Sequence, residues 1–241
     1  MRISGIGYVG GGEYKESLYV KGTAKLNGDV KCEAVEVYGS FKGNGNLIAN
    51  STVKASGFFS IEGMLSAEDD VKASGSLKVG KSLTSAKNVS VSGGFECGGT
   101  VKCQNLKISG GVDCEEGLEA EEITISGTIK CNGIINAENM KIEYSGSSNV
   151  IASVGGSRIW IKPKRALINR LPLISKINDK ASLKIVESVE GDVVTIVGVA
   201  APLVTGRVVN IGAGCEVDKV TYSEGISIDP DAIVKSFEKI G

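Results

Sequence analysis

The sequence predicts an all-β protein: a right-handed parallel β-helix with triangular coils of about 17–18 residues and a C-terminal β extension. One observation is a set of glycines recurring at nearly constant intervals, at Gly22, Gly39, Gly57, Gly75, Gly93, Gly110 and Gly127. A second is that apolar residues fall on alternate positions around each glycine, which is the period of a strand with one buried face. Such self-similarity is typical of a solenoid, in which each unit buries its apolar face against its neighbours.

Four apolar columns define the coil when each repeat glycine is taken as position zero. Four residues before the glycine stand Leu18, Val35, Val53, Val71, Val89, Leu106 and Ile123, and two before it stand Val20, Val37, Ala55, Ala73, Val91, Ile108 and Ile125. Two after it stand Ala24, Phe41, Phe59, Leu77, Phe95, Val112 and Ile129, and eight after it stand Val30, Leu47, Leu65, Leu83, Val101, Leu118 and Ile135. Spacing by two excludes helical repeats, whose apolar positions recur at i, i+3 and i+4.

Glycine also marks the corners of the predicted coil. The repeat glycine is one corner, and a second corner follows six residues later, at Gly28, Gly45, Gly63, Gly99 and Gly133. We expect positive φ at these glycines, because a sharp turn requires it. The third corner lies just before the next apolar pair and absorbs the one-residue drift of the repeat. Two inward residues on most sides favour the right-handed form, as does the general preference for right-handed connections between parallel strands.

Four segments are predicted along the chain. Residues 1–16 keep the register through Gly5 but are polar, as in an N-terminal cap or partial coil. Residues 17–157 form the β-helix, and residues 158–180 form a basic amphipathic interruption. Residues 181–241 form a C-terminal β segment with a shorter repeat of about a dozen residues, which is either continued solenoid or a small module packed on its end.

The interruption has the sequence RIWIKPKRALINRLPLISKINDK, with seven cationic residues, a single acid and the only tryptophan of the chain. A basic amphipathic stretch of this kind can lie on an anionic membrane surface. The residues expected to make such a contact are Arg158, Trp160, Lys162, Lys164, Arg165 and Arg170. The alternative, which is favoured, is a linker whose apolar residues dock on the β-helix.

Composition narrows the possible functions. The formal net charge of −1 over 241 residues gives no global field that would recruit nucleic acid. The absence of histidine removes the commonest general base and metal ligand at neutral pH. No apolar run resembles a signal peptide or approaches the ~20 residues needed to span a bilayer, so we expect a cytoplasmic protein with six reduced cysteines.

Two nucleotide-binding patterns occur by letter, and neither has the required context. Gly75 to Ser82 matches a phosphate-binding loop, but alternating apolar residues follow it where a helix is needed. Gly5 to Gly10 matches a dinucleotide fingerprint without a βαβ unit around it. The cysteines share columns with small or apolar residues, which indicates buried thiols rather than metal ligands. We therefore expect no nucleotide, metal or other cofactor.

The repeat units resemble those of bactofilins, a family of polymer-forming bacterial cytoskeletal proteins. The resemblance rests on LYVKGTAKLNGDVKCE (residues 18–33), LKISGGVDCEEGLEAEE (residues 106–122) and ITISGTIKCNGIINAEN (residues 123–139), and it covers roughly residues 3–142. It implies a right-handed β-helix that assembles end to end into filaments without nucleotide. It also implies a cytoskeletal scaffold at the inner face of the membrane for cell-envelope or morphogenetic proteins. This chain departs from the usual plan of one β-helix between disordered tails, because strands are predicted after residue 181.

We therefore expect a non-enzymatic structural protein whose partners are further copies of itself, an anionic membrane surface and cell-envelope proteins. Assembly has a physical basis as well, since the end of a β-helix exposes unpaired backbone groups that can template another subunit. One alternative is a monomeric β-helical adaptor that binds through a flat sheet face. A β-helix enzyme is the least favoured, because the repeats contain no histidine base and no long loops around a groove.

Overall fold

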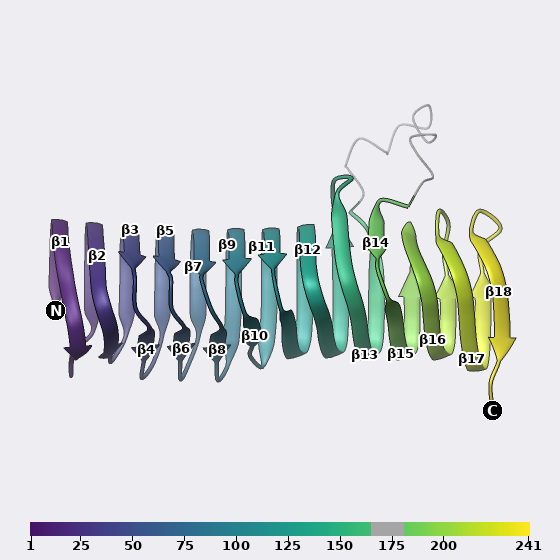
Figure 1. Ribbon diagram of the computed structural model, residues 1–241, viewed down its shortest axis with the longest axis horizontal. Coiled ribbons are helices and arrows are strands. Elements are labelled where there is room, and N and C mark those ends of the chain that lie inside the picture. The colour runs from purple at the N-terminus through teal and green to yellow at the C-terminus, as the bar shows by residue number, and fades with distance from the viewer. Residues whose placement is uncertain (165–180) are drawn as a thin grey trace. The chain divides into compact units, whose positions relative to one another are not determined.

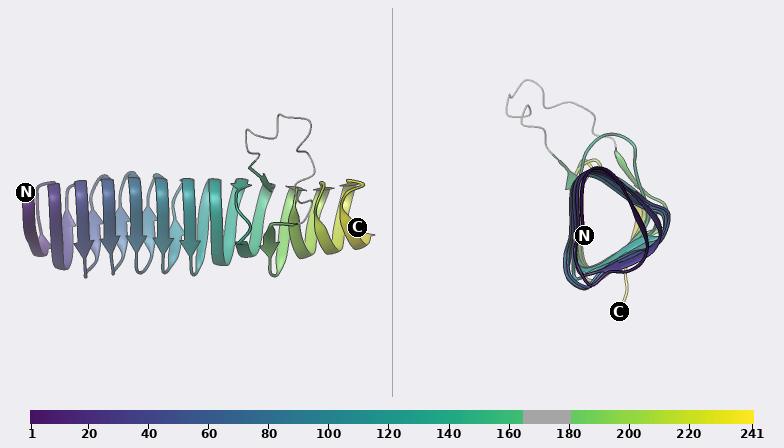
Figure 2. Two further views of the ribbon diagram at one scale, coloured as in Figure 1. Left: turned by 90° about the horizontal axis from the view of Figure 1, so that it is seen from above. Right: turned by 90° about the vertical axis from the view of Figure 1, so that its left-hand side faces the viewer.

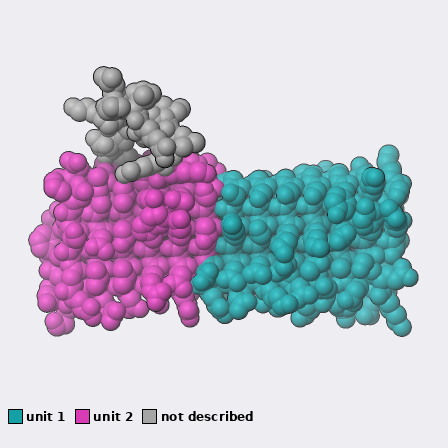
Figure 3. All heavy atoms as spheres, turned by 180° about the vertical axis from the view of Figure 1, so that it is seen from behind, with its two compact units in different colours: residues 1–122 teal, residues 123–241 magenta. Residues whose placement is uncertain are grey.

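The computed structural model describes residues 1–164 and 181–241, and this part of the chain is all-β with no helix. Its strands pair in parallel to form stacked coils, so the predicted class, a parallel β-solenoid, is confirmed (Figure 1). The chain divides into two compact units, Met1–Glu122 and Ile123–Gly241 (Figure 3).

Unit 1 is built from long strands that turn a corner, alternating with short strands on the third side of the coil. The strands are β1 (Arg2–Glu13), β2 (Leu18–Cys32), β3 (Val35–Gly43), β4 (Leu47–Ala49), β5 (Val53–Ile61), β6 (Leu65–Ala67), β7 (Val71–Val79), β8 (Leu83–Ser85), β9 (Asn88–Cys97), β10 (Thr100–Lys102) and β11 (Asn105–Cys114). Seen along their stacking direction, these coils have the predicted three-sided outline (Figure 2). β1 pairs with β2 along its length, so residues 2–13 form the first coil of the solenoid.

The predicted repeat glycines form one ladder through unit 1. Register pairs join Gly5 to Gly22 and continue coil by coil to Gly110. From Gly22 to Gly110 the ladder glycines have φ between 113° and 139°, and Gly127, in unit 2, has φ 148°. A Cβ atom at Gly39 would overlap the carbonyl oxygen of Gly22 in the preceding coil, and the same relation holds at Gly22, Gly57, Gly75, Gly93 and Gly110 but not at Gly5, in the first coil. Glycine is therefore required both by its backbone dihedral and by the close approach of the coils.

The second corner carries glycine for a different reason from the one predicted. Gly28 has φ 92°, but Gly45, Gly63 and Gly99 do not have positive φ, so that prediction is wrong for these three. Glycine is required here because the neighbouring coil lies too close for a side chain. A Cβ at Gly63 would lie 2.5 Å from the carbonyl oxygen of Gly45, and one at Gly99 would lie 2.9 Å from the backbone nitrogen of Ser82. Neighbouring coils stack too closely here to admit a side chain.

The four apolar columns point into the coil, and all of their members are buried. The bulkiest column contains Phe41 and Phe59, whose rings stack with centroids 5.0 Å apart. The third corner absorbs the drift in period, as predicted. Cys32 pairs with Ala49 before this corner and Val35 pairs with Val53 after it, so the offset between partners grows by one residue there.

Unit 2 continues the solenoid pattern through residues 181–241. After β12 (Gly117–Tyr144), which begins at the end of unit 1, its strands are β13 (Asn149–Pro163), β14 (Leu183–Ile185), β15 (Ser188–Ile196), β16 (Val199–Ile211), β17 (Glu216–Ile228) and β18 (Ile233–Lys239). Val189 pairs with Val204, Val204 with Val220, and Val220 with Phe237, so each coil is one residue longer than the coil before it. The repeat is therefore longer than predicted for this segment, and β14 and β15 stack on β13 rather than forming a separate module.

The predicted interruption begins too early, because residues 158–163 belong to β13 and pair with both β12 and β15. The glycine ladder itself stops at Tyr144, which stands one repeat after Gly127. The Tyr144 ring is buried, and its hydroxyl donates a hydrogen bond to the carbonyl oxygen of Gly198 at 2.6 Å. A large inward side chain thus replaces the corner glycine.

Candidate interaction surfaces

Three of the residues predicted to contact a membrane lie together on β13. Arg158, Trp160 and Lys162 occupy alternate positions and are not buried, while the residues between them point into the core. Lys164 follows the strand and is exposed. The other two predicted residues, Arg165 and Arg170, lie outside the described part of the chain.

The ring of Trp160 lies close to two ammonium groups. The Nζ of Lys162 is 4.2 Å from the ring centroid and the Nζ of Lys141 is 5.1 Å from it. Glu143 pairs with both lysines, at 3.5 and 3.6 Å, and Arg158 donates to the side-chain oxygen of Asn139 at 3.0 Å. Cations outnumber carboxylates on this surface, and a tryptophan among lysines is a combination found at membrane interfaces. Among the described residues, no helix is long and apolar enough to cross a bilayer.

Each unit contains one terminal strand with an open edge. β1 pairs with β2, and β18 pairs with β17. In the described part of the chain, no further coil lies on the outer edge of either strand (Figure 1). An open strand edge presents N–H and C=O groups that can pair with another chain.

The last coil leaves part of its apolar column uncovered. Phe237 stands in register with Val220, Val204 and Val189, all of which are fully buried. Phe237 itself is 58% exposed, because no described coil follows it. The last described coil therefore has an exposed aromatic side chain at a position that is buried in the preceding coils.

A column of mostly charged residues crosses unit 1 on the side of the coil that follows the ladder glycine. We call it the central column; it consists of Tyr8, Lys25, Lys42, Ser60, Lys78, Glu96 and Asp113, one residue per coil, joined by consecutive register pairs. None of its members is among the predicted contact residues, although each stands three residues after a ladder glycine.

The basic half of the central column borders a hollow of about 550 Å³. Lys42 extends over the ring of Phe58, with its Nζ 5.3 Å from the centroid. Within the described residues no ion pair engages Lys25 or Lys42, whereas Lys78 pairs with Glu96 at 2.6 Å. Two adjacent lysines in neighbouring strands repel each other, so this part of the sheet suits an anionic partner.

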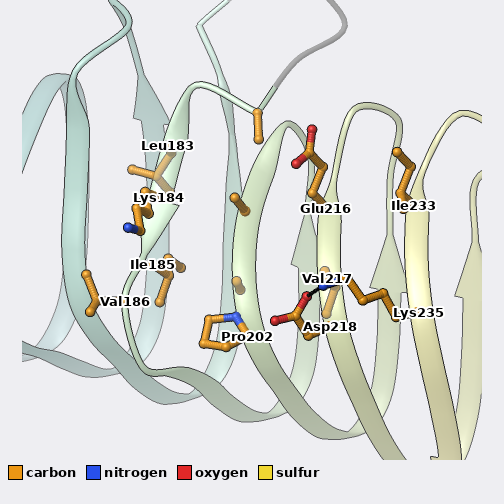
Figure 4. A pocket seen from close by; sticks show the side chains of 13 residues that line it. Leu183, Lys184, Ile185, Val186, Pro202, Glu216, Val217, Asp218, Ile233 and Lys235 are labelled. Carbon is orange, nitrogen blue, oxygen red and sulfur yellow. Dashed lines mark ion pairs between the residues drawn. The ribbon is translucent and has the colours of Figure 1, made fainter.

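A second hollow, of about 490 Å³, lies on unit 2 among β14, β16, β17 and β18 (Figure 4). It is open because the short side chain of Ala200 stands between Lys184 and Glu216 in the register. Lys235 and Asp218 form an ion pair of 2.7 Å at its wall. Its lining is mainly apolar, with Lys184, Glu216, Asp218 and Lys235 as its charged members.

Five of the six cysteines are buried and Cys103 is half-buried, and none forms a disulfide. Burial raises the pKa of Cys32 and Cys215, and the neighbouring Cys114 together with burial raises the pKa of Cys97. Burial also raises the pKa of Cys103, to about 11. These thiols are protonated at neutral pH and therefore poor nucleophiles and metal ligands. Among the described residues, no group of three or more cysteines and carboxylates is placed to hold a metal ion.

Both nucleotide patterns lie within the coil. The first runs through β7, which ends at Val79, and the next strand begins at Leu83, so no helix follows the glycines. The second lies inside β1. A phosphate-binding loop needs the N-terminus of a helix, which neither place provides.

Comparisons with protein-family models, curated proteins and solved structures found no match to this chain.

Proposed function

We propose that this protein is a non-enzymatic structural protein whose copies join end to end, through their terminal coils, into filaments that need no nucleotide. In this proposal the filaments act as a cytoskeletal scaffold beside a membrane for proteins of the cell envelope. The β-solenoid fold is compatible with such a role. The observation that carries the proposal is the uncovered apolar column at the C-terminal coil.

Covering that coil would be favourable. Phe237 occupies a core position, and an aromatic side chain of its size buries roughly 200 Å² when fully enclosed. Since 58% of it is exposed, a following coil would remove about 100 Å² from water, which contributes about 2.5 kcal/mol. Pairing the open edge of β18 adds main-chain hydrogen bonds to that contact.

The N-terminal coil supports the same role with different chemistry. β1 contains five glycines, Gly5, Gly7, Gly10, Gly11 and Gly12, so its outer edge is mostly accessible backbone. Among the described residues β1 pairs only with β2. In this proposal its other edge receives a strand of the next copy.

Membrane attachment is the second part of the proposal. The surface formed by Arg158, Trp160 and Lys162 supports it, because cations around an amphipathic ring favour an anionic lipid surface. Co-sedimentation with anionic vesicles tests it, using a variant in which Lys164, Arg165 and Arg170 are neutralised. Reduced pelleting of the variant is expected, and unchanged pelleting would count against this segment.

The non-enzymatic role is supported by the state of the possible nucleophiles. The raised pKa of the Cys97 and Cys103 thiols keeps them in the unreactive form at neutral pH. The chain also has no histidine to act as a general base.

Sedimentation velocity of purified protein tests end-to-end assembly. Phe237→Arg places a charge in the proposed joint and should reduce assembly, whereas Ile48→Arg, at an outward position 41% exposed on β4, is the matched control and should not. Wild-type protein that stays monomeric at tens of micromolar would contradict assembly and favour the alternative of a monomeric adaptor that binds through a sheet face.

A further inference from the structure

We propose that two copies of this protein also associate side by side in opposite orientation, through the face of unit 1 that carries the central column. The proposal goes beyond end-to-end assembly and uses a different surface. It rests on the order of charges along the column and on the sizes of the side chains beside it.

The central column is divided by charge along the stacking direction. Its early coils carry Lys25 and Lys42, and its late coils carry Glu96 and Asp113. Like charges in neighbouring strands are unfavourable in an isolated sheet. The adjacent lysines have no ion pair within the described residues, so a partner outside the single copy is the available source of compensating charge.

In a reversed pair, the lysines of each copy face the acids of the other. The column has the order Tyr8, Lys25, Lys42, Ser60, Lys78, Glu96, Asp113. If a two-fold axis passes between the coils of Ser60 and Lys78, Lys25 lies opposite Asp113 of the second copy and Lys42 lies opposite Glu96 of the second copy. The same axis repeats both pairs, so four attractive contacts form. Placing the copies in the same orientation and register would instead set lysine against lysine.

The outward columns on either side of the central column also fit this arrangement, because some of their side chains differ in size between early and late coils. Phe58, two residues before Ser60, would meet the small Ser76 of the second copy. On the opposite side, Asn44 and Glu62 would meet Gly98 and Gly80 of the second copy. At these three positions a larger side chain of one copy faces a glycine or serine of the other, which allows the middle of the two sheets to approach.

The available area suits a reversible pair. Seven coils at ~4.8 Å and about five residues per side at ~3.3 Å give a face of roughly 550 Å² per copy, or about 1,100 Å² in total. This lies near the lower end of specific interfaces, where association is weak to moderate. Charge complementarity then determines orientation more than it determines affinity.

Charge reversal in the full-length protein tests the pairing by sedimentation equilibrium at low salt. Lys25→Glu with Lys42→Glu replaces both lysines that face acids and should weaken self-association of this variant by at least about 100-fold, since all four contacts become repulsive. A basic variant, Glu96→Lys with Asp113→Lys, should likewise fail to pair with itself. An equal mixture of the two should form a heterodimer, because every contact is then attractive.

The control variant changes the net charge by the same amount at residues outside the central column. Lys21→Glu with Lys107→Glu alters two exposed lysines on the side of the coil that precedes the ladder glycine, and pairing should remain as in the wild type. Pairing by the acidic variant at wild-type strength would overturn the proposal whether or not the basic variant folds. So would a mixture of two folded variants that remains monomeric. Phe237→Arg separates the two associations: it should leave side-by-side pairs intact if only end-to-end joints are lost.

Discussion

The adjacent glycines of β9 provide a sharp test of why the ladder requires glycine. Gly93 has φ 129°, and a Cβ there would overlap the carbonyl oxygen of Gly75 in the preceding coil. At Gly94 the nearest atom to an added Cβ is Oγ of Ser76, 4.0 Å away, and φ is not positive. A methyl group added at Gly93 should therefore change the stability of the protein differently from one added at Gly94.

Gly93→Ala should lower the free energy of unfolding by about 3 kcal/mol or more. An L-residue held in this part of φ/ψ space costs about 1–3 kcal/mol, and displacing the neighbouring coil adds to that cost. Gly94→Ala should leave stability unchanged or raise it by up to about 1 kcal/mol, because alanine restricts the unfolded chain at a compatible position. Urea titration followed by circular dichroism measures both. With a slope of about 3 kcal/mol per M, the Gly93→Ala midpoint should fall by about 1 M. Equal midpoints for the two variants would refute this account of the ladder.

Three further outcomes follow from the structure. Tyr144→Phe removes the donor to the buried carbonyl oxygen of Gly198 and should lower the free energy of unfolding by about 1–3 kcal/mol in urea titration; a change below about 0.5 kcal/mol would contradict it. Burial holds the pKa of Cys103 at about 11, above its ordinary 9.0, so the folded state binds this proton more tightly and stability should fall as pH rises from 9 to 11. Cys103→Ala should flatten that decline in a series of unfolding curves, and identical pH profiles would argue against it. Trp160 fluorescence should shift to shorter wavelength with anionic vesicles, less so in Lys162→Gln; no shift in the wild type would count against membrane contact.

The repeated part of the fold could be predicted because the period of the ladder glycines and the alternation of apolar residues both indicate the same coil. The columns through Phe41 and Leu47 alternate by two residues and are buried as expected. The reason for glycine at Gly63 could not be predicted, because it depends on the distance to Gly45 in another coil. A residue type indicates a local dihedral preference, whereas a close approach between coils is visible only once the register is known.

The predicted start of the basic segment, at residue 158, lies inside β13, because a basic composition does not by itself end a strand. Arg158 and Lys162 look like part of a polar interruption, yet residues at alternate positions between them continue the core of β13. The charges on a solenoid strand are compatible with the strand, since every second residue faces outward.

The central column was missed for another reason. Lys25 and Lys42 stand one repeat apart, as do Glu96 and Asp113, so their adjacency is encoded in the repeat. The order of charges along the central column becomes apparent only when the outward residues of successive coils are compared position by position. When they are treated together as one solvated face, that order is not visible. The two hollows, by contrast, depend on small side chains such as Ser60 and Ala200 beside larger ones, which the pattern alone does not single out.

Electron microscopy of the purified full-length protein tests the central claim most directly. Samples at micromolar concentrations in the absence of nucleotide should show unbranched filaments, with Phe237→Arg giving few or none and Ile48→Arg resembling the wild type. Uniform single particles of the wild type across this range would contradict end-to-end assembly through the terminal coils.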